Sequence, residues 1–316
     1  MHSNNEVASF WSELEKSLPY PKYITGVMEF NFAEFAHRIR NLDLPFIKNL
    51  VNDLFAGNVV IVRGAVSQAH IEYIKQTVLR FELENKPTFF KVLEGCPDFH
   101  REVTPSVAGK SSYSFRRIQH LYYFYRWNSF GKILFPIADN TWDLYKTLCG
   151  WAPGSFKSST PKDGLVDRLH IHHYPIGAGE QELHQDPYLA QKMIMGHLLS
   201  EKGVGREYES GGIYYLKEDG GIVDVDSELR AGDAYISFPL LVHGVARIDS
   251  GSKESWGTEK GRWFMGYYTL YSDHVDGRHT GWSYDSVNHP GNRGGSELWE
   301  DGAMNKRLNK LSPEVR

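Results

Sequence analysis

The stretch Leu183-His184-Gln185-Asp186-Pro187-Tyr188 decides how the rest of this chain is interpreted, together with Leu241-Val242-His243-Gly244-Val245 further along. His184 and Asp186 are two residues apart, so on an extended strand their side chains leave the same face of the sheet. If the chain folds back so that His243 reaches the same point, three ligands occupy one face of a metal ion and the opposite face stays open. Two histidines and one carboxylate in that arrangement suit a non-haem Fe(II) centre.

Short strands separated by glycine-rich turns are predicted after Pro161, which is typical of a β-sandwich or barrel. Eight strands are expected, the number that a jelly roll requires. In this order His184 and Asp186 end the second strand and His243 begins the seventh. Asp186 and His243 are 57 residues apart (243 − 186), so only the folded sandwich can supply the third ligand. The expected strands are 168–174, 181–186, 193–199, 212–216, 221–225, 234–238, 242–248 and 262–271.

The first half of the chain is predicted to be mainly helical. Helices are expected over 7–18, 32–39, 45–55 and 141–149, and the β-branched run 58–64 fits a buried strand. Ser67 is placed to cap the N-terminus of a helix over 69–83. The expected organisation is a helical N-terminal framework over 1–160, a double-stranded β-helix (jelly-roll, cupin-like) core over 161–275 and an extension over 276–316. Together they form one compact unit, mainly β with flanking helices (α+β).

Hydrophobic periodicity fails between residues 87 and 127, where cations are interleaved with aromatic residues. A long irregular insert in a compact domain is often a lid or binding loop, so this segment is expected to face the substrate. Arg116, Arg117 and Tyr188 are the candidate substrate residues. A purely structural insert is an open alternative. Single-stranded nucleic acid also binds cations and rings, but the cluster is short and the protein is acidic.

The overall composition favours a small-molecule partner. The net charge is −4, and no run of five or six like charges occurs, so neither a nucleic-acid surface nor a basic membrane patch is indicated. No stretch of about 18 apolar residues is present, and the first residues lack the features of a secretory signal. Cys96 and Cys149 are too few for a disulfide framework. A cytoplasmic protein is therefore expected, and its oligomeric state is not indicated.

Further motifs follow one another in a definite order: His172-His173-Tyr174-Pro175, His184-x-Asp186, Gly211-Gly212-Ile213-Tyr214-Tyr215-Leu216, Arg230-Ala231-Gly232-Asp233-Ala234, His243-Gly244-Val245 and Gly261-Arg262-Trp263-Phe264. Taken together they resemble the Fe(II)/2-oxoglutarate-dependent dioxygenase superfamily. The resemblance covers roughly 168–271, and the lead-in over 58–83 is similar to that of the phytanoyl-CoA-dioxygenase-like branch.

The resemblance implies an oxygenase with a double-stranded β-helix core, which uses Fe(II), O2 and 2-oxoglutarate as a co-substrate. His184, Asp186 and His243 would be the metal ligands and the catalytic centre. Decarboxylation of 2-oxoglutarate, with release of CO2 and succinate, would be coupled to hydroxylation of a small polar or acidic metabolite such as an amino acid, a sugar or a natural-product intermediate. Asp186 favours hydroxylation, because halogenating members of the superfamily have a small residue there. Desaturation, epimerisation and ring formation use the same kind of iron site.

Arg262 begins the last predicted strand, 19 residues after His243 (262 − 243), where the resemblance places the cation that binds the distal carboxylate of 2-oxoglutarate. A guanidinium matches a carboxylate bidentately and stays charged when buried. Fe(II) with Asp186 carries a charge of +1 and 2-oxoglutarate carries −2, so one buried arginine would restore neutrality. Arg247 is the competing cation. Tyr174 and His172, on the first core strand, are further candidates for contact with the co-substrate.

Several alternatives stay open. A JmjC-type protein hydroxylase or demethylase shares the His-x-Asp and distal His pattern, although the arginine on the last strand disfavours it. A non-catalytic jelly-roll binding module would carry the same histidines as surface residues. His170, His172 and His173 are rival ligands that lack a carboxylate two residues on, and His197 is expected in the core. Trp263 and Tyr267 are expected in the core or along the pocket.

Overall fold

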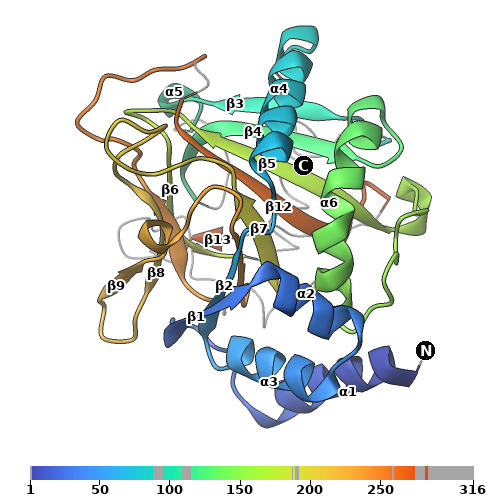
Figure 1. Cartoon of the computed structure of the whole chain (residues 1–316). Helices are drawn as coiled ribbons and strands as arrows, with labels where there is room; N and C mark the ends of the chain where they lie inside the picture. The colour runs from blue at the N-terminus through green and yellow to red at the C-terminus, as the bar shows by residue number, and fades with distance from the viewer. Residues whose placement is uncertain are drawn as a thin grey trace.

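The structure is a computed structural model, and it describes residues 2–87, 95–108, 115–186, 188, 192–257, 260–274 and 282–283. Two β-sheets face each other, with helices on the outer side of the larger one (Figure 1). The helices are α1 (His2–Ser17), α2 (Phe32–Arg40), α3 (Leu44–Phe55), α4 (Gln68–Glu84), α5 (Pro105–Ala108) and α6 (Ser129–Leu148), with 3-10 turns at Pro161–Asp163 and Asp226–Glu228. No helix in these residues is long and apolar enough to cross a membrane.

The strands are β1 (Gly26–Asn31), β2 (Asn58–Arg63), β3 (Phe99–Val103), β4 (Arg117–Tyr125), β5 (Leu165–Tyr174), β6 (Glu180–Gln185), β7 (Ile194–Leu198), β8 (Gly212–Leu216), β9 (Ile222–Asp224), β10 (Ala234–Ser237), β11 (His243–Ala246), β12 (Arg262–Tyr271) and β13 (Trp282–Ser283). The major sheet runs β1-β2-β10-β7-β12-β5-β4, with β3 beside β4. The minor sheet runs β6-β11-β8-β9, with β13 beside β6, and β4 also pairs with β6 and so joins the two sheets.

Strands β5 to β12 form a double-stranded β-helix. Along the chain the path crosses repeatedly from one sheet to the other, so that β5, β12, β7 and β10 lie in the major sheet and β6, β11, β8 and β9 in the minor sheet. All eight strands predicted between 168 and 271 are present, each within a few residues of its predicted bounds. The predicted fold class is therefore confirmed.

Register in the major sheet separates an inner face from an outer face. Strand β12 is antiparallel to β5, and Arg262 lies opposite Tyr174, Phe264 opposite His172 and Tyr268 opposite Arg168. Because side chains alternate along a strand, the even-numbered residues of both strands share the face toward the minor sheet. The odd-numbered residues point to the helices.

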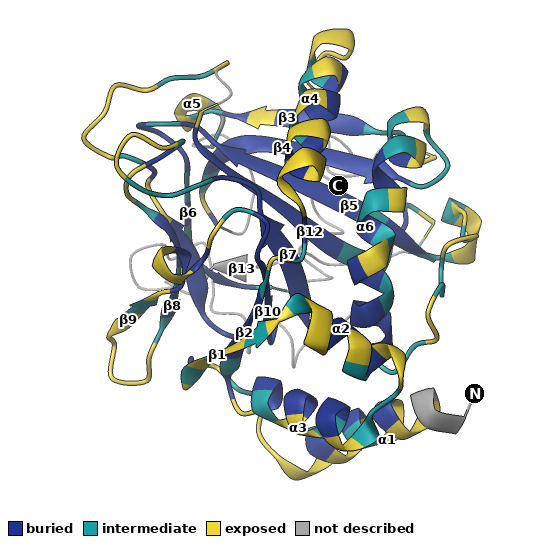
Figure 2. Cartoon of the chain, viewed as in Figure 1, coloured by how far each residue is buried: buried dark blue, intermediate teal, exposed yellow. Residues whose placement is uncertain are grey.

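The helix-facing side of the major sheet contains the main hydrophobic core. Helices α4 and α6 cover this face, and the strands beneath them are almost entirely buried (Figure 2). Trp142 of α6 stacks on Tyr267 with ring centroids 4.8 Å apart. Trp263 and Tyr267 are fully buried here, which places both in the core rather than beside the minor sheet.

The N-terminal elements extend the major sheet and close its end. Strand β1 pairs in parallel with β2, and β2 pairs with β10 of the β-helix core. The predicted cap is present: Ser67 Oγ accepts a hydrogen bond from His70 N at the start of α4 (3.3 Å). Helices α2, α3 and α4 match the predicted helices within two residues at most ends, because their apolar spacing and capping residues are unambiguous.

Two predictions for the first half were wrong. The segment 87–127 was expected to be irregular, but it contains β3 and β4, and β4 is a nine-residue strand next to β5. Eight of those nine residues are buried, so the strand faces protein on both sides and lacks the polar–apolar alternation of a half-exposed strand. The helix expected over 141–149 is the second half of α6, which begins at Ser129 and passes through Pro136. Strand β1 was not predicted.

Candidate metal centre

Three side chains from two neighbouring strands meet between the sheets. His184, Asp186 and His243 each offer a ligand atom, and these atoms all lie within 4.8 Å of one another. His184 Nε2 is 3.8 Å from Asp186 Oδ1, and His243 Nε2 is 3.6 Å from Asp186 Oδ2. His243 lies directly opposite His184 in the antiparallel pair of β11 and β6, which brings the two distant segments together.

Backbone carbonyls orient both imidazoles. His184 Nδ1 donates to the carbonyl oxygen of Glu182 (2.9 Å), and His243 Nδ1 donates to that of Leu241 (2.8 Å). A neutral imidazole with its proton on Nδ1 presents a lone pair on Nε2. In both residues Nε2 is the atom near Asp186, so the tautomers and ring orientations match those of metal-binding histidines.

Burial keeps His184 in the neutral form that a metal ligand needs. Burial, together with the neighbouring His243, lowers the pKa of His184 well below its usual value, so the imidazole is neutral at physiological pH. Burial raises the pKa of Asp186, and His243 and Arg117 oppose that rise. Two neutral imidazoles and one carboxylate fit a divalent transition-metal ion.

A β-bulge in β6 places Gln181 beside the centre. Val245 pairs with Gln181 and His243 pairs with His184, so three steps along β6 oppose two along β11. As a result Gln181 and His184 share a face, and Gln181 Nε2 donates to His184 Nε2 (2.9 Å). Tyr174 donates its hydroxyl proton to Gln181 Oε1 (2.8 Å). Gln181 was not predicted, because regular alternation would put it on the opposite face from His184.

Arg262 is buried in a bidentate ion pair with Asp226. Nε of Arg262 donates to Asp226 Oδ1 (2.9 Å) and Oδ2 (3.1 Å), and Nη2 donates to Oδ1 (2.7 Å). The Tyr208 hydroxyl donates to the same carboxylate. Burial lowers the pKa of Arg262, but Asp226, Tyr208 and Tyr235 together raise it above its usual value, so the guanidinium stays charged. Gly212 makes room for this pair, because a Cβ there would lie 2.0 Å from Asp226 Oδ2.

The other candidate residues fall into different environments. Tyr174 and His172 are buried on the inner face of β5, and His172 Nδ1 lies 3.1 Å from Gln119 Oε1. Arg247, the competitor of Arg262, is exposed on the surface and pairs with Glu180 (2.9 Å). Arg116 pairs with the same glutamate (3.1 Å) and is half exposed.

The remaining substrate candidates are separated from each other. Arg117 is half-buried, and its charge acts on both His184 and Asp186. Tyr188 packs against Phe238 and Tyr20 and donates its hydroxyl proton to Glu15 of α1. Tyr188 thus lies with the N-terminal helix, whereas the Arg117 guanidinium lies 4.5 Å from the centroid of the Phe115 ring, which stacks on His184.

The other core-strand histidines stay outside the group. Among the described residues, His184, Asp186 and His243 form the one cluster of three or more potential ligands close enough to share an ion. His173 lies on the outer face and stacks on Trp263 with centroids 4.4 Å apart. His197 is fully buried beside Thr141, as expected of a core histidine (3.2 Å).

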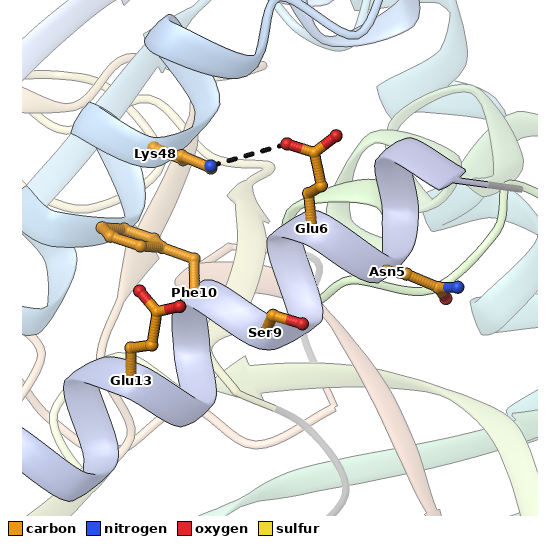
Figure 3. Close-up of a pocket in the computed structure, with 6 residues that line it drawn as sticks. All are labelled: Asn5, Glu6, Ser9, Phe10, Glu13 and Lys48. Atoms are coloured by element: carbon orange, nitrogen blue, oxygen red, sulfur yellow. Dashed lines mark ion pairs between the residues drawn. The ribbon is translucent and has the colours of Figure 1, made fainter.

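A hollow between α1 and α3 carries no comparable chemistry. Figure 3 shows Glu6 and Glu13 along α1 with Lys48 of α3 opposite, and Lys48 Nζ is 3.6 Å from Glu6 Oε2. The two glutamates are exposed and solvated. The hollow is lined only by residues of α1 and α3, and none of them belongs to the cluster of His184, Asp186 and His243. We therefore assign it no part in the metal centre.

The strand order is that of a double-stranded β-helix, and the converging triad is the two-histidine, one-carboxylate arrangement that suits a non-haem Fe(II) centre. Neither the family models nor the curated proteins contain a match to the chain. Solved structures do show similarity, at low identity.

A prolyl-4-hydroxylase of Pseudomonas putida is 15% identical, with 71% of this chain and 98% of that chain covered and a TM-score of 0.43. A full-length Neurospora crassa protein in complex with alpha-KG and thymine is 14% identical, with 79% and 87% covered and a TM-score of 0.47. SnoN, a non-heme alpha ketoglutarate dependent epimerase from nogalamycin biosynthesis, is 12% identical, with 75% and 91% covered and a TM-score of 0.42. The fold assignment rests on the strand order and register described above.

Proposed function

We propose that this protein is an Fe(II)- and 2-oxoglutarate-dependent oxygenase that hydroxylates a small polar or acidic metabolite. The observation that carries the proposal is the triad, in which two histidines with fixed tautomers and one carboxylate converge between the sheets of a double-stranded β-helix. A surface His/Asp cluster in a binding module would lack both the burial and the paired carbonyl contacts.

His184, Asp186 and His243 would hold the iron. Ferrous iron in such a centre supplies the activation of O2 that is coupled to decarboxylation of 2-oxoglutarate to succinate and CO2. The task of the protein is to fix the ligands and exclude water. The carbonyls of Glu182 and Leu241 orient the two imidazoles, and burial of both histidines limits access of solvent.

Arg262 would bind the distal carboxylate of 2-oxoglutarate, with Tyr174 and His172 beside it. A guanidinium has more than one hydrogen-bonding edge, and Asp226 takes the Nε and Nη2 atoms. The co-substrate would therefore bind on the Nη1 side while Asp226 holds the group in place. Asp226 already neutralises Arg262, so Arg262 does not offset the net charge of −1 that Fe(II), Asp186 and 2-oxoglutarate would carry together. Arg117, which acts on His184 and Asp186, then contributes positive charge near the co-substrate.

A reducing compartment such as the cytoplasm suits this proposal. Cys96 and Cys149 are both free and buried, and Fe(II) is most readily kept reduced in such an environment.

Release of labelled CO2 and succinate from 2-oxoglutarate tests the proposed function. We expect Fe(II)-dependent succinate formation, stimulated by candidate acids, amino acids or sugars, with a gain of one oxygen atom in the product. His184→Ala and Asp186→Ala should abolish it while the fold, measured by circular dichroism, is retained. Succinate formation that persists in both variants would reject the ligand assignment, and its complete absence in the wild type with every candidate would favour a binding module.

A further inference from the structure

A second cation, half-buried, lies on the inner face of the β-helix, toward the opposite end of β5 from Arg262. Arg262 faces Tyr174 across β12 and β5, and Arg168 is six residues before Tyr174 (174 − 168). At a rise of about 3.3 Å per residue this separates the two positions by about 20 Å. 2-Oxoglutarate is too short to reach both, so a co-substrate held at Arg262 leaves Arg168 for another ligand.

Arg168 has neutral partners. Its Nε donates to His170 Nε2 (2.5 Å), and its guanidinium lies over the Tyr123 ring, 4.9 Å from the centroid, and interacts with the Tyr125 hydroxyl. Within the part of the chain that the structure describes, no carboxylate forms an ion pair with it, whereas Arg262 has Asp226. A half-buried guanidinium without a counter-charge is costly, and an anionic ligand would relieve that cost.

The residues around Arg168 face the same way and provide a surface for an organic ligand. His170 stacks on Tyr268 with centroids 4.0 Å apart and meets Tyr123 edge-on at 4.6 Å. Tyr268 retains partial exposure although its neighbour Tyr267 is fully buried. His172 is 8% exposed, yet its Nε2 has no hydrogen-bond partner, nor does Nε2 of the adjoining Gln119. Nε2 of His172 and Nε2 of Gln119 could therefore each form a hydrogen bond with a polar ligand on this face.

The charge of the Asp186 carboxylate reaches tyrosines beside both cations. Burial raises the pKa of Tyr268, and the Asp186 carboxylate raises it further. Burial also raises the pKa of Tyr174, where Asp186 again adds to the rise against the opposing effect of Arg262 and Arg117. Asp186 therefore acts on tyrosines beside both Arg168 and Arg262. A molecule anchored at Arg168 would extend along this inner face toward Asp186.

We propose that Arg168 binds a carboxylate of the prime substrate, so that the enzyme acts on organic acids whose anionic end lies against Arg168, His170 and Tyr268. This inference rests on the proposed function for the position of the co-substrate. It narrows the substrate class from polar or acidic metabolites to carboxylic acids. It also assigns their recognition to the first core strand rather than to the segment around Arg116.

Equilibrium binding of matched acids and amides tests this assignment. Benzoate, phenylacetate, hexanoate and N-acetylglycine would each be compared with the corresponding carboxamide by calorimetry, using the full chain with Fe(II) and 2-oxoglutarate without oxygen. At least one acid should bind tenfold or more tightly than its amide, since a hydrogen bond to a charged group is worth about 1.5–3 kcal/mol and about 1.4 kcal/mol is tenfold. Arg168→Gln should remove that preference, and Arg168→Lys should retain part of it.

Two controls separate this proposal from the proposed function. Arg206→Gln, at an exposed arginine, should leave the acid preference unchanged. The affinity for 2-oxoglutarate should change less than twofold in Arg168→Gln; a large loss would assign Arg168 to the co-substrate and overturn the inference. An acid preference that survives in Arg168→Gln, or no preference for any acid in the wild type, would also overturn it. If 2-oxoglutarate itself fails to bind the wild type, the proposed function is wrong. The acid–amide comparison, repeated without 2-oxoglutarate, then still shows whether Arg168 binds a carboxylate. If Arg168→Gln does not fold, Arg168→Lys carries the test.

Discussion

Asp226→Asn tests whether the buried ion pair fixes Arg262. The side chains of Asp226 and Arg262 are 0% and 1% exposed, and three hydrogen bonds of 2.7 to 3.1 Å join them. An asparagine keeps the shape but removes the counter-charge. Removing one partner of a buried ion pair costs about 3–5 kcal/mol, because it leaves an uncompensated charge. We therefore expect the free energy of unfolding to fall by about 3 kcal/mol or more.

Urea unfolding with and without 2-oxoglutarate measures both the stability lost in Asp226→Asn and the binding of the co-substrate to Arg262. If Arg262 binds the co-substrate, the carboxylate of 2-oxoglutarate replaces part of the lost charge, so the ligand should stabilise Asp226→Asn more than it stabilises the wild type. The double variant Asp226→Leu with Arg262→Met should be less destabilised than either single change, because an apolar replacement leaves no unpaired charge.

Asp224→Asn is the matched control. Asp224 is half exposed and pairs with Lys202 at 3.1 Å, so its loss should cost less than about 1 kcal/mol. A loss below about 1 kcal/mol for Asp226→Asn, or a double variant as unstable as the sum of the single ones, would refute the reasoning. Equal stabilisation of the wild type and Asp226→Asn by 2-oxoglutarate would remove Arg262 from the co-substrate site.

Further predictions concern metal binding, acid stability and the glycine beneath Asp226. His184→Ala and His243→Ala should each reduce Fe(II) or Co(II) binding from one ion per chain to an undetectable level in equilibrium dialysis, and a chelator should lower the Tm of the metal-loaded wild type only. Burial lowers the pKa of His100 to about 4 from 6.5, so its contribution to stability is complete above pH 6.5 and is lost as the pH falls toward 4. His100→Phe should therefore reduce the stability lost between about pH 7 and 4 by up to about 3 kcal/mol, and an unchanged acid-unfolding curve would contradict this. Gly212→Ala should lower the free energy of unfolding by about 3 kcal/mol, because φ is +109° and the added Cβ would lie 2.0 Å from Asp226 Oδ2. Gly205→Ala should cost about 1 kcal/mol, because φ is +72° and no atom lies within 4 Å of the added Cβ. Equal losses in the two glycine variants, measured by urea unfolding, would show that the ion pair tolerates the added methyl group.

The sequence by itself was sufficient for the β-helix core and for the order of its strands. Short apolar runs and the glycine-rich turns between them are local properties, so the eight strands could be predicted without knowledge of their neighbours. His184 and Asp186 were placed on one strand end for the same reason. Their partner His243 was identified by residue type and by its position at the start of the seventh strand.

Strand β4 and helix α6 show where local patterns are insufficient. Strand β4 has protein on both faces and so no alternation, and it lacks the flanking glycine-rich turns that marked the core strands. A helix that runs through Pro136 is held by the surrounding core rather than by its own propensity. Both elements depend on neighbours that are distant in the chain.

The tertiary structure alone decided which charges meet. Gln181 reaches His184 because of a bulge in the pairing of β6 with β11, and Asp226 reaches Arg262 from a 3-10 turn 36 residues earlier. Arg168 acquires its potential role from the strand register that places it on the inner face, beside Tyr268. Residue type and alternation determine which side chains can leave one face of a strand. Which side chains then lie opposite them depends on the pairing of whole strands, and that pairing results from packing across the entire sandwich.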